Sequence, residues 1–220
     1  MGKNKVVLLF SGGIDSTVLL FWLLSRNYEI FPLFINYGQK SYEGELEAIN
    51  KILKDLNTKN NLLTLNMPEL QLVGSGALVG EYPKNISSHN EWYASEFFPN
   101  RNMILLSIAA TYGYKLQISK IAIGVVGDSY QDTTRTFLEA MEMTLAQSIA
   151  RYELIAPFAG HPRQKVIEEA YRLQVPLKST FSCNAMGNRH CLLCTSCYER
   201  EKAIQLHEQC GKERAEKSDF

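Results

Sequence analysis

The residues of this chain with the clearest chemistry are 11–17, which read Ser-Gly-Gly-Ile-Asp-Ser-Thr. They follow the apolar run Lys5–Phe10 and precede a second apolar run, Val18–Leu24, which is long enough for a buried helix. A strand, a glycine turn and a helix start present free backbone N–H groups to an anion. The two glycines allow a sharp turn and a close approach to a phosphate group. Residues 11–17 therefore predict a phosphate-binding loop.

The side chains of this loop narrow the prediction. Asp15, Ser16 and Thr17 can cap the helix that follows, and the two hydroxyls can donate hydrogen bonds to phosphate oxygens. No lysine follows the second glycine, which excludes the GxxxxGK[ST] loop of ordinary nucleoside triphosphatases. The loop instead resembles that of the ATP-pyrophosphatase superfamily, whose members split ATP between the α and β phosphates and adenylate a substrate. This resemblance implies ATP binding by Phe10, Ser11, Gly12, Gly13, Ile14, Asp15, Ser16 and Thr17.

A second group of reactive side chains lies near the C-terminus. Four of the five cysteines fall within fifteen residues, at Cys183, Cys191, Cys194 and Cys197. Without an export signal, such crowding indicates a metal site rather than disulfides. Zinc held by four thiolates is the simplest interpretation, because closed tetrahedral sites of this kind are structural. An iron–sulfur cluster also uses four cysteines and remains the alternative.

Apolar runs of strand length alternate with stretches of helical spacing along the rest of the chain. The predicted strands cover 5–10, 30–36, 61–65, 120–126 and 152–156, and the predicted helices cover 18–24, 41–56, 103–114, 133–148 and 162–173. This alternation predicts an α/β fold with a doubly wound, Rossmann-like parallel sheet of about five strands. Ligands bind beyond the carboxyl ends of such strands, where residues 11–16, 36–39 and 127–132 converge.

The remaining segments define the expected domain organisation. Residues 1–178 form the predicted ATP-pyrophosphatase domain, in which the aperiodic stretch 67–98 is interpreted as a long loop or lid. Residues 179–220 form a small zinc-binding segment with the four cysteines and a C-terminal helix.

Composition and charge limit the classes of partner. The chain has 220 residues, of which 45% are hydrophobic, and its 23 basic and 23 acidic residues cancel. A nucleic-acid or membrane partner is therefore not expected. The N-terminal residues show no signal segment, and no apolar run reaches membrane-spanning length, so we expect a cytoplasmic protein.

The order of these motifs resembles one family, the 7-cyano-7-deazaguanine synthases (QueC). The matching segments run from about Val6 to Ala203 and comprise Phe10–Thr17, Asn36–Gln39, Pro99–Asn102, Thr180–Asn184 and the CxxCxxC motif. The resemblance implies an ATP-dependent C–N ligase. In this family the carboxylate of 7-carboxy-7-deazaguanine is adenylated and captured by ammonia, and the resulting amide is adenylated again and dehydrated to the nitrile.

The resemblance also implies roles for individual residues. Asp15, Ser16, Lys165 and Arg101 would be catalytic, with Asp15 the route to Mg²⁺ and Lys165 near the phosphates. Tyr37, Gln39, Arg101 and Asn102 would complete the ATP site. The implied cofactors are ATP, Mg²⁺ and a structural Zn²⁺, the implied partners are a small deazapurine and ammonia, and the implied assembly is a homodimer.

One loop departs from the family pattern. Where the family has a substrate loop resembling Asp-x-Ser-Gly-Tyr-Pro-Asp-Cys-Arg, residues 127–135 read Gly-Asp-Ser-Tyr-Gln-Asp-Thr-Thr-Arg. Tyr130 and Asp132 remain and, with Asp128, are the expected substrate-binding residues. The departure leaves a diverged paralogue as an alternative, one that joins the activated carboxylate to another amine, such as a protein N-terminus in antiphage defence. A tRNA-thiolating enzyme with the same loop is a further alternative, against which the balanced charge argues.

Overall fold

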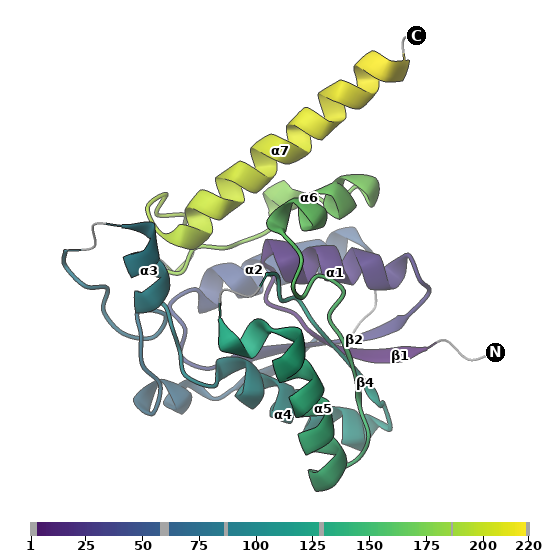
Figure 1. Ribbon diagram of the computed structural model, residues 1–220, viewed down its shortest axis with the longest axis vertical. Coiled ribbons are helices and arrows are strands. Elements are labelled where there is room, and N and C mark those ends of the chain that lie inside the picture. Colours follow the sequence, from purple (N-terminus) through teal and green to yellow (C-terminus); the bar gives the residue numbers. More distant parts are fainter. Residues whose placement is uncertain (1–3, 58–61, 86–87, 128–129, 186, 219–220) are drawn as a thin grey trace.

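A five-stranded sheet forms the centre of the chain. The computed structural model describes residues 4–57, 62–85, 88–127, 130–185 and 187–218. All strands are parallel and lie in the order β3-β2-β1-β4-β5 (Figure 1). The strands are β1 (Lys5–Leu9), β2 (Glu29–Asn36), β3 (Leu63–Asn66), β4 (Lys120–Ile123) and β5 (Glu153–Ile155). The α/β prediction is confirmed.

Helices cover both faces of this sheet. One core contains Val6 and Leu8 of β1 together with α1 (Ile14–Leu24), α2 (Tyr42–Asp55) and α6 (Arg163–Arg172). The other contains Val7 and Leu9 of the same strand together with α4 (Arg101–Leu116) and α5 (Arg135–Ser148). Neighbouring residues of β1 enter different cores because strand side chains alternate between faces. The sheet is therefore doubly wound, as predicted.

The stretch 67–98 is more regular than the sequence indicated. It contains the 3-10 helix η1 (Pro68–Leu72) and the helix α3 (His89–Ser95). Ser88 caps α3, because its hydroxyl accepts a hydrogen bond from the N–H of Glu91 at 3.3 Å. Two predicted boundaries also differ from the structure. The strand predicted over 120–126 ends at Ile123, and the helix predicted from 133 begins at Arg135, after the 3-10 helix η2 (Gln131–Thr133).

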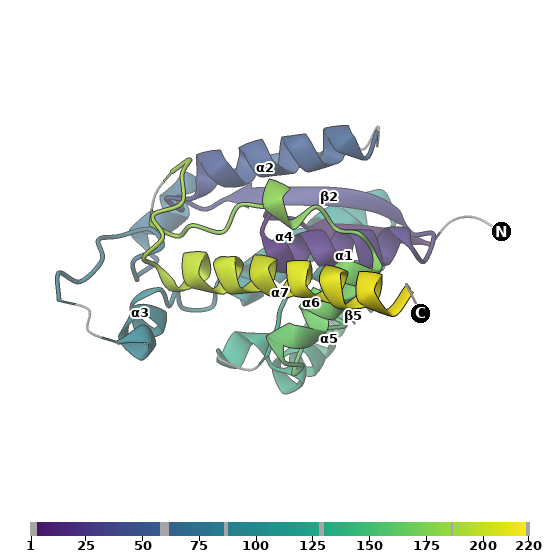
Figure 2. The same ribbon diagram turned by 90° about the horizontal axis from the view of Figure 1, so that it is seen from above.

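The C-terminal part packs against α6 and extends beyond the body of the molecule. It begins with the 3-10 helix η3 (Leu177–Ser179) and ends with α7 (Thr195–Ser218), the long helix that projects beyond the rest of the molecule in Figure 1 and is seen from above, in front of α1 and α6, in Figure 2. A separate small core joins Ala48, Phe181 and three of the cysteines. Within the described residues, none of the helices combines the length and apolarity needed to cross a bilayer.

Candidate active site

The loop between β1 and α1 lies at the switch point of the sheet. β1 pairs with β2 on one side and with β4 on the other, and in open α/β sheets ligands bind where the strand order reverses in this way. Gly12 has a φ of +69°, and a Cβ there would approach the carbonyl oxygen of Glu45 to 3.0 Å. A Cβ on Gly124, just after β4, would lie 2.8 Å from the backbone nitrogen of Ser16. Both positions therefore need glycine.

The start of α1 is open to an anion. Gly13 is the N-cap residue and supplies no side-chain acceptor to the first turn of the helix. The Ser11 and Ser16 hydroxyls lie 3.2 Å apart, and the Ser16 hydroxyl donates to the carbonyl oxygen of Gly13 at 3.3 Å. We call residues 11–16 the phosphate loop, because backbone N–H groups and two hydroxyls gather there.

A cavity of about 360 Å³ opens beside this loop. It brings together most of the residues predicted from the sequence, which are Phe10, Ser11, Gly13, Ile14, Asp15, Ser16, Tyr37, Gln39, Arg101, Asn102, Tyr130 and Asp132. Gly12, Thr17 and Lys165 do not line it. Thr17 is fully buried, and its hydroxyl has no hydrogen-bond partner among the described residues. Asp128 lies outside the described residues.

The cation that contacts the phosphate loop is Arg163, which the sequence analysis missed. Its Nη1 lies 2.5 Å from Oδ1 of Asp15, and its Nε lies 3.9 Å from Oε2 of Glu199 on α7. Burial raises the pKa of Asp15 by more than the Arg163 guanidinium lowers it, so the net effect is a raised pKa. Arg163 is the first residue of α6, directly after Pro162, so the helix start places the guanidinium toward α1.

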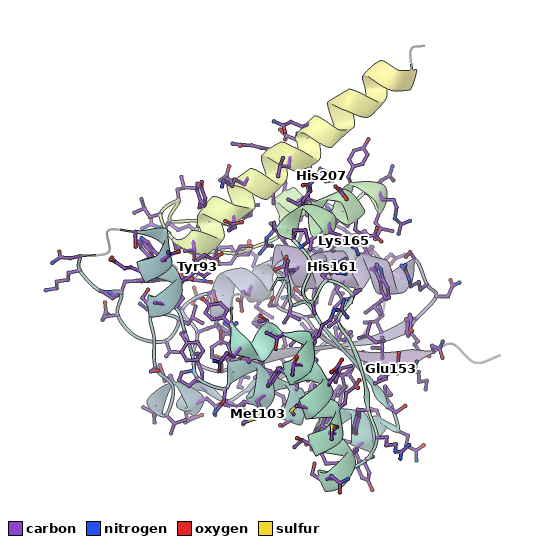
Figure 3. The ribbon with its side chains drawn as sticks, viewed as in Figure 1. Tyr93, Met103, Glu153, His161, Lys165 and His207 are labelled. Carbon is purple, nitrogen blue, oxygen red and sulfur yellow. The ribbon has the colours of Figure 1, made fainter. Side chains whose placement is uncertain are left out.

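Lys165 lies two residues further along α6 and has different neighbours. Its side chain is exposed, and its Nζ is 3.2 Å from Nε2 of His161 (Figure 3). Arg135 approaches the same His161 nitrogen at 3.4 Å. Slight burial and these two cations lower the pKa of His161. The structure thus places Lys165 in a basic group outside the cavity.

Tyr37, Gln39 and Arg101 form one side of the cavity. The Gln39 amide is fully engaged: it accepts from the Tyr37 N–H at 2.8 Å and donates to Glu45 at 3.0 Å and to the Ile35 carbonyl at 3.2 Å. Burial raises the pKa of Tyr37 by more than the neighbouring Arg101 guanidinium lowers it, so the net effect is a raised pKa. Gln39 therefore holds the loop in shape, and Tyr37 and Arg101 present the polar atoms.

Asn102 and Asp132 are joined directly. The backbone N–H of Asn102 donates to Oδ2 of Asp132 at 3.1 Å, and its Nδ2 donates to the Asp132 carbonyl at 3.0 Å. The nearby Tyr130 donates its hydroxyl to the carbonyl of Tyr93 at 3.0 Å, and burial followed by the charge of Glu96 raises the pKa of Tyr130 to about 12. These contacts fix the divergent loop against the first turn of α4.

Glu96 is a second residue that the sequence analysis missed. Only 5% of it is exposed, yet it lines the cavity. Its carboxylate accepts hydrogen bonds from Tyr82 at 2.9 Å, Asn184 at 3.0 Å and Thr195 at 2.6 Å. We call these four residues the Glu96 cluster. It connects the 67–98 segment to the cysteine-bearing part of the chain.

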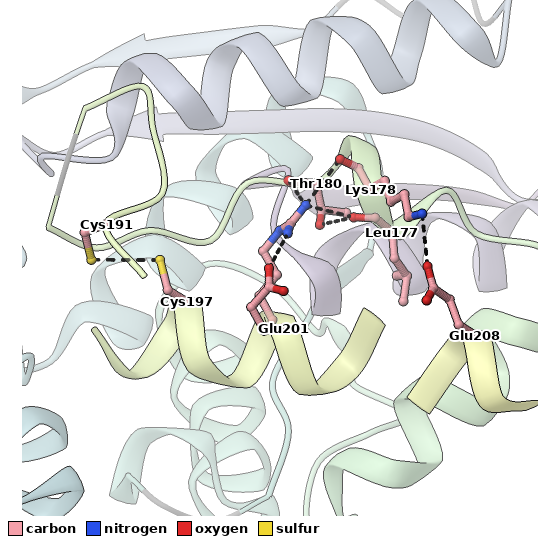
Figure 4. A network of polar contacts seen from close by, with 8 residues as sticks. Leu177, Lys178, Thr180, Cys191, Cys197, Glu201 and Glu208 are labelled. Atoms are coloured by element: carbon pink, nitrogen blue, oxygen red, sulfur yellow. Dashed lines mark hydrogen bonds and ion pairs between the residues drawn. The ribbon is translucent and has the colours of Figure 1, made fainter. Parts of the chain in front are cut away.

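The four predicted cysteines meet in space. Their sulfur atoms all lie within 4.8 Å of one another, and those of Cys191 and Cys197 are 3.9 Å apart (Figure 4). Zn–S bonds of about 2.3 Å require S···S separations of roughly 3.8 Å, so a modest contraction would close a tetrahedral site. Backbone N–H groups of Leu193 and Cys194 point at the Cys191 sulfur, which stabilises a thiolate. The donor set therefore fits a metal ion.

The cysteine site is tied to the phosphate loop. Arg200 on α7 donates through Nη2 to the carbonyls of Lys178 at 3.2 Å and Thr180 at 3.3 Å, and Figure 4 shows these contacts beside the cysteines. The next residue, Phe181, donates its N–H to the Gly12 carbonyl at 3.0 Å. Metal-dependent order in the C-terminal part would therefore support the turn of the phosphate loop.

Comparison with known proteins agrees with this geometry. The sequence profile described as "Queuosine biosynthesis protein QueC" matches residues 5–208. The chain belongs to the QueC family. Its relatives include the 7-cyano-7-deazaguanine synthases of Archaeoglobus fulgidus, 35% identical over 91% of this chain and 85% of the relative, and of Nautilia profundicola, 32% identical over 92% and 94%.

The family assignment confirms the resemblance noted from the motifs and, with it, a QueC-type, ATP-dependent enzyme. The relatives do not favour a paralogue that joins the carboxylate to another amine. Among solved structures, a 4-thiouridine synthetase in complex with RNA and ATP superposes with a TM-score of 0.54 at 22% identity. That match covers 92% of this chain but only half of the other, and it shows the fold alone.

Proposed function

We propose that this QueC-family enzyme converts 7-carboxy-7-deazaguanine and ammonia to 7-cyano-7-deazaguanine, using two ATP. The observation that carries the proposal is the open phosphate loop at the switch point, with Asp15 and Arg163 in contact beside a cavity large enough for small ligands. The names of the relatives supply the product, and the family resemblance implies the substrate.

The proposed first step is adenylation. A carboxylate oxygen of the substrate attacks the α-phosphorus, and pyrophosphate leaves. Ammonia then attacks the acyl carbon and AMP leaves, which gives the amide. In the second round the amide oxygen attacks a second ATP, and loss of AMP from the adenylated amide gives the nitrile. Each attack builds negative charge on the departing pyrophosphate, which donors fixed in place stabilise most effectively.

The residues of the cavity divide this work. Ser11, Ser16 and the N–H groups at the start of α1 would hold phosphate oxygens, and Arg163 would neutralise the leaving group. Arg101 and Tyr37 would contact the nucleotide. Gly12 and Thr17 would act through the backbone of the loop, since neither lines the cavity. Lys165 would act from outside the cavity, which it does not line.

The cavity also contains carboxylates suited to Mg²⁺. Asp15 and Glu199 both line it and are each about one quarter exposed at the side chain. Carboxylate oxygens are the protein ligands Mg²⁺ prefers, together with phosphate oxygens of the substrate. When bound, Mg²⁺ would neutralise charge on the triphosphate of ATP.

The loop around Tyr130 is the proposed site for the deazapurine. Tyr130 and Asp132 line the cavity, and Asp128 is the third residue proposed there. Phe97 stacks on the Tyr130 ring with centroids 6.0 Å apart, which gives an apolar wall suited to a flat heterocycle.

The C-terminal part completes the proposal. Residues 179–220 form the proposed zinc-binding segment, with Cys183, Cys191, Cys194 and Cys197 as ligands of a structural Zn²⁺, and residues 1–178 the catalytic domain. We further propose a cytoplasmic homodimer, on the basis of the family resemblance alone.

One incubation tests the proposed function. The purified enzyme is mixed with ATP, Mg²⁺, 7-carboxy-7-deazaguanine and ammonium, and the products are identified by mass spectrometry. We expect the nitrile, with AMP and pyrophosphate in twofold molar amounts. Accumulation of the adenylate, without amide or nitrile, would contradict the proposal and favour a different amine acceptor. Omission of ATP and heat-killed enzyme are the controls.

A further inference from the structure

The Glu96 carboxylate is buried but has only neutral partners. Tyr82 and Thr195 donate hydroxyl groups to it, and Asn184 donates an amide N–H. None of these donors carries a positive charge. Among the described residues, no lysine, arginine or histidine forms an ion pair with Glu96. Hydrogen bonds from neutral groups do not cancel the negative charge of a carboxylate.

The other carboxylates of the cavity are placed differently. Asp15 and Glu199 both lie beside the Arg163 guanidinium, within 4 Å. Glu45 and Asp132 are both under the electrostatic influence of Arg101. Asp15 and Glu199 thus pair with an arginine. Glu45 has neutral hydrogen-bond donors, as Glu96 does, but Arg101 also acts on it electrostatically. A buried and uncompensated charge is costly, so the Glu96 position is suited to a cation that binds and leaves.

The neighbouring cysteine site makes this part of the cavity more negative still. Asn184 and Thr195, two of the donors to Glu96, are adjacent in sequence to Cys183 and Cys194. Four thiolates carry four negative charges, of which a divalent metal ion would cancel two. With a divalent metal ion bound, the cysteine site would keep a net negative charge, which favours a cation beside Glu96.

Three aromatic residues line the cavity together with Glu96. These residues are Tyr93, Phe97 and Tyr130. The ring centroids of Tyr93 and Tyr130 are 6.1 Å apart, and those of Phe97 and Tyr130 are 6.0 Å apart. Aromatic faces attract small cations that have lost part of their water. Tyr93 also lies within electrostatic reach of Asp15 and Arg163, so the same space adjoins the phosphate loop.

We propose that Glu96 binds the ammonium ion and converts it to the ammonia that attacks the adenylated carboxylate. The proposal rests on the proposed function, because that reaction needs a nitrogen nucleophile and ammonium is the form that predominates at neutral pH. Arg163 pairs with Asp15 and Glu199, and Arg101 acts on Glu45 and Asp132, so among the described carboxylates of the cavity Glu96 is the best placed for a small cation.

The step balances without a further reactant. One N–H bond of ammonium breaks, and its proton moves to a carboxylate oxygen of Glu96. The freed electron pair forms the C–N bond to the acyl carbon as the C–O bond to AMP breaks, and AMP leaves with that electron pair. The incoming nitrogen loses a second proton to solvent, which gives the neutral amide. Glu96 then returns its proton to solvent before the next ammonium binds.

The test compares two nucleophiles in the variant Glu96→Gln. Ammonium must be bound and deprotonated, whereas hydroxylamine is mostly neutral at neutral pH and gives a hydroxamate with the same adenylate. We expect the KM for ammonium to rise about tenfold or more, since a charge-assisted hydrogen bond is lost. The rate of hydroxamate formation and the KM for ATP should stay within about twofold, which also shows that the variant is folded.

Three further variants separate charge from structure. Tyr82→Phe and Thr195→Val each remove one donor but keep the Glu96 charge, and Glu69→Gln removes an exposed charge in the same segment. We expect each to change the KM for ammonium by less than about threefold. An unchanged KM for ammonium in Glu96→Gln, or an equal loss with both nucleophiles, would overturn the proposal. If the wild-type enzyme forms neither amide nor nitrile from ammonium, the proposed function itself is wrong.

Discussion

The phosphate loop and the Glu96 cluster are two parts of one cavity wall that are built in opposite ways. The phosphate loop is six consecutive residues that lead from the end of β1 into the first turn of α1, and its donors are mostly backbone N–H groups. The Glu96 cluster joins residues separated in sequence by 14, 88 and 99 positions, and its donors are all side chains. The first is suited to anionic phosphate and the second to a small cation.

The difference shows how one cavity can serve two substrates of opposite charge. A helix start provides positive potential from a local turn, and Arg163 adds a positive side chain to it. A negative site within the same wall needs a buried carboxylate. The hydrogen-bond donors that stabilise the charge of this carboxylate come from several segments of the chain. Substitutions in the loop should therefore affect ATP chemistry, and removal of the Glu96 charge should affect the nitrogen donor.

The largest effect is expected at Asp15. Asp15→Ala removes the carboxylate that contacts Arg163 and would hold Mg²⁺, so AMP formation should fall about 10³-fold, or about 4 kcal/mol in activation free energy. The measurement is AMP release from ATP with the substrate present. Asp55→Ala, at an exposed position at the end of α2, is the matched control and should retain full activity. Undiminished turnover in Asp15→Ala would remove the loop from the mechanism.

The next effect concerns the cysteines that support both parts of the wall. Cys194→Ser should release the metal and lower the unfolding free energy by about 3 kcal/mol or more, a fall in Tm of roughly 6–12 °C. Elemental analysis should find about one zinc per wild-type chain and almost none in the variant. Cys210→Ser changes the one cysteine that is not among the four proposed ligands, and it should leave the zinc content unchanged. If the wild-type protein instead contains iron and acid-labile sulfide, the zinc assignment is wrong and the four cysteines hold an iron–sulfur cluster.

A smaller effect separates two basic residues of α6. Arg163→Gln should raise the KM for ATP about tenfold, because a cation beside the triphosphate site is lost. Lys165→Gln should change it by less than about twofold, since Lys165 lies outside the cavity next to His161. Steady-state kinetics with varied ATP measures both. An equal rise of the KM for ATP in both variants would contradict this and support the role of Lys165 near the phosphates that the resemblance implied.

The smallest effect is expected in the divergent loop. Asp132→Asn keeps the acceptor for the Asn102 N–H but removes a negative charge from the start of α4, which costs about 0.3–1 kcal/mol. We expect a Tm lower by roughly 1–4 °C and a KM for the deazapurine a few-fold higher, with the KM for ATP unchanged. Glu139→Gln, exposed on α5, is the control. A change in the KM for ATP alone would place Asp132 on the nucleotide side.

Sequence reasoning succeeded where the determinants are local. The order of the strands and helices followed from periodicity, because each element shows its own pattern of apolar residues. The phosphate loop and the four cysteines were found because their residues lie within short motifs. The position of most predicted side chains on one cavity followed from the rule that ligands bind at the carboxyl ends of parallel strands.

The residues that were missed depend on contacts between distant segments. Glu96 looks like an ordinary surface glutamate until the cysteine part packs against it, and only the fold brings Asn184 and Thr195 to its carboxylate. Arg163 and Lys165 differ by two positions, which on a helix turns the side chain to another face. One local signal was present and overlooked: Ser88 and Glu91 are spaced as a capping box, which would have predicted α3 within the aperiodic stretch.

The central claim, adenylation of a carboxylate by the phosphate loop, can be tested with an oxygen label. The enzyme is given 7-carboxy-7-deazaguanine with both carboxylate oxygens replaced by ¹⁸O, together with ATP and ammonium, and the AMP is analysed by mass spectrometry. Because one oxygen leaves in each adenylation, the account predicts that both molecules of AMP carry a single ¹⁸O and that pyrophosphate carries none. Unlabelled AMP, or label in ADP or inorganic phosphate, would contradict it.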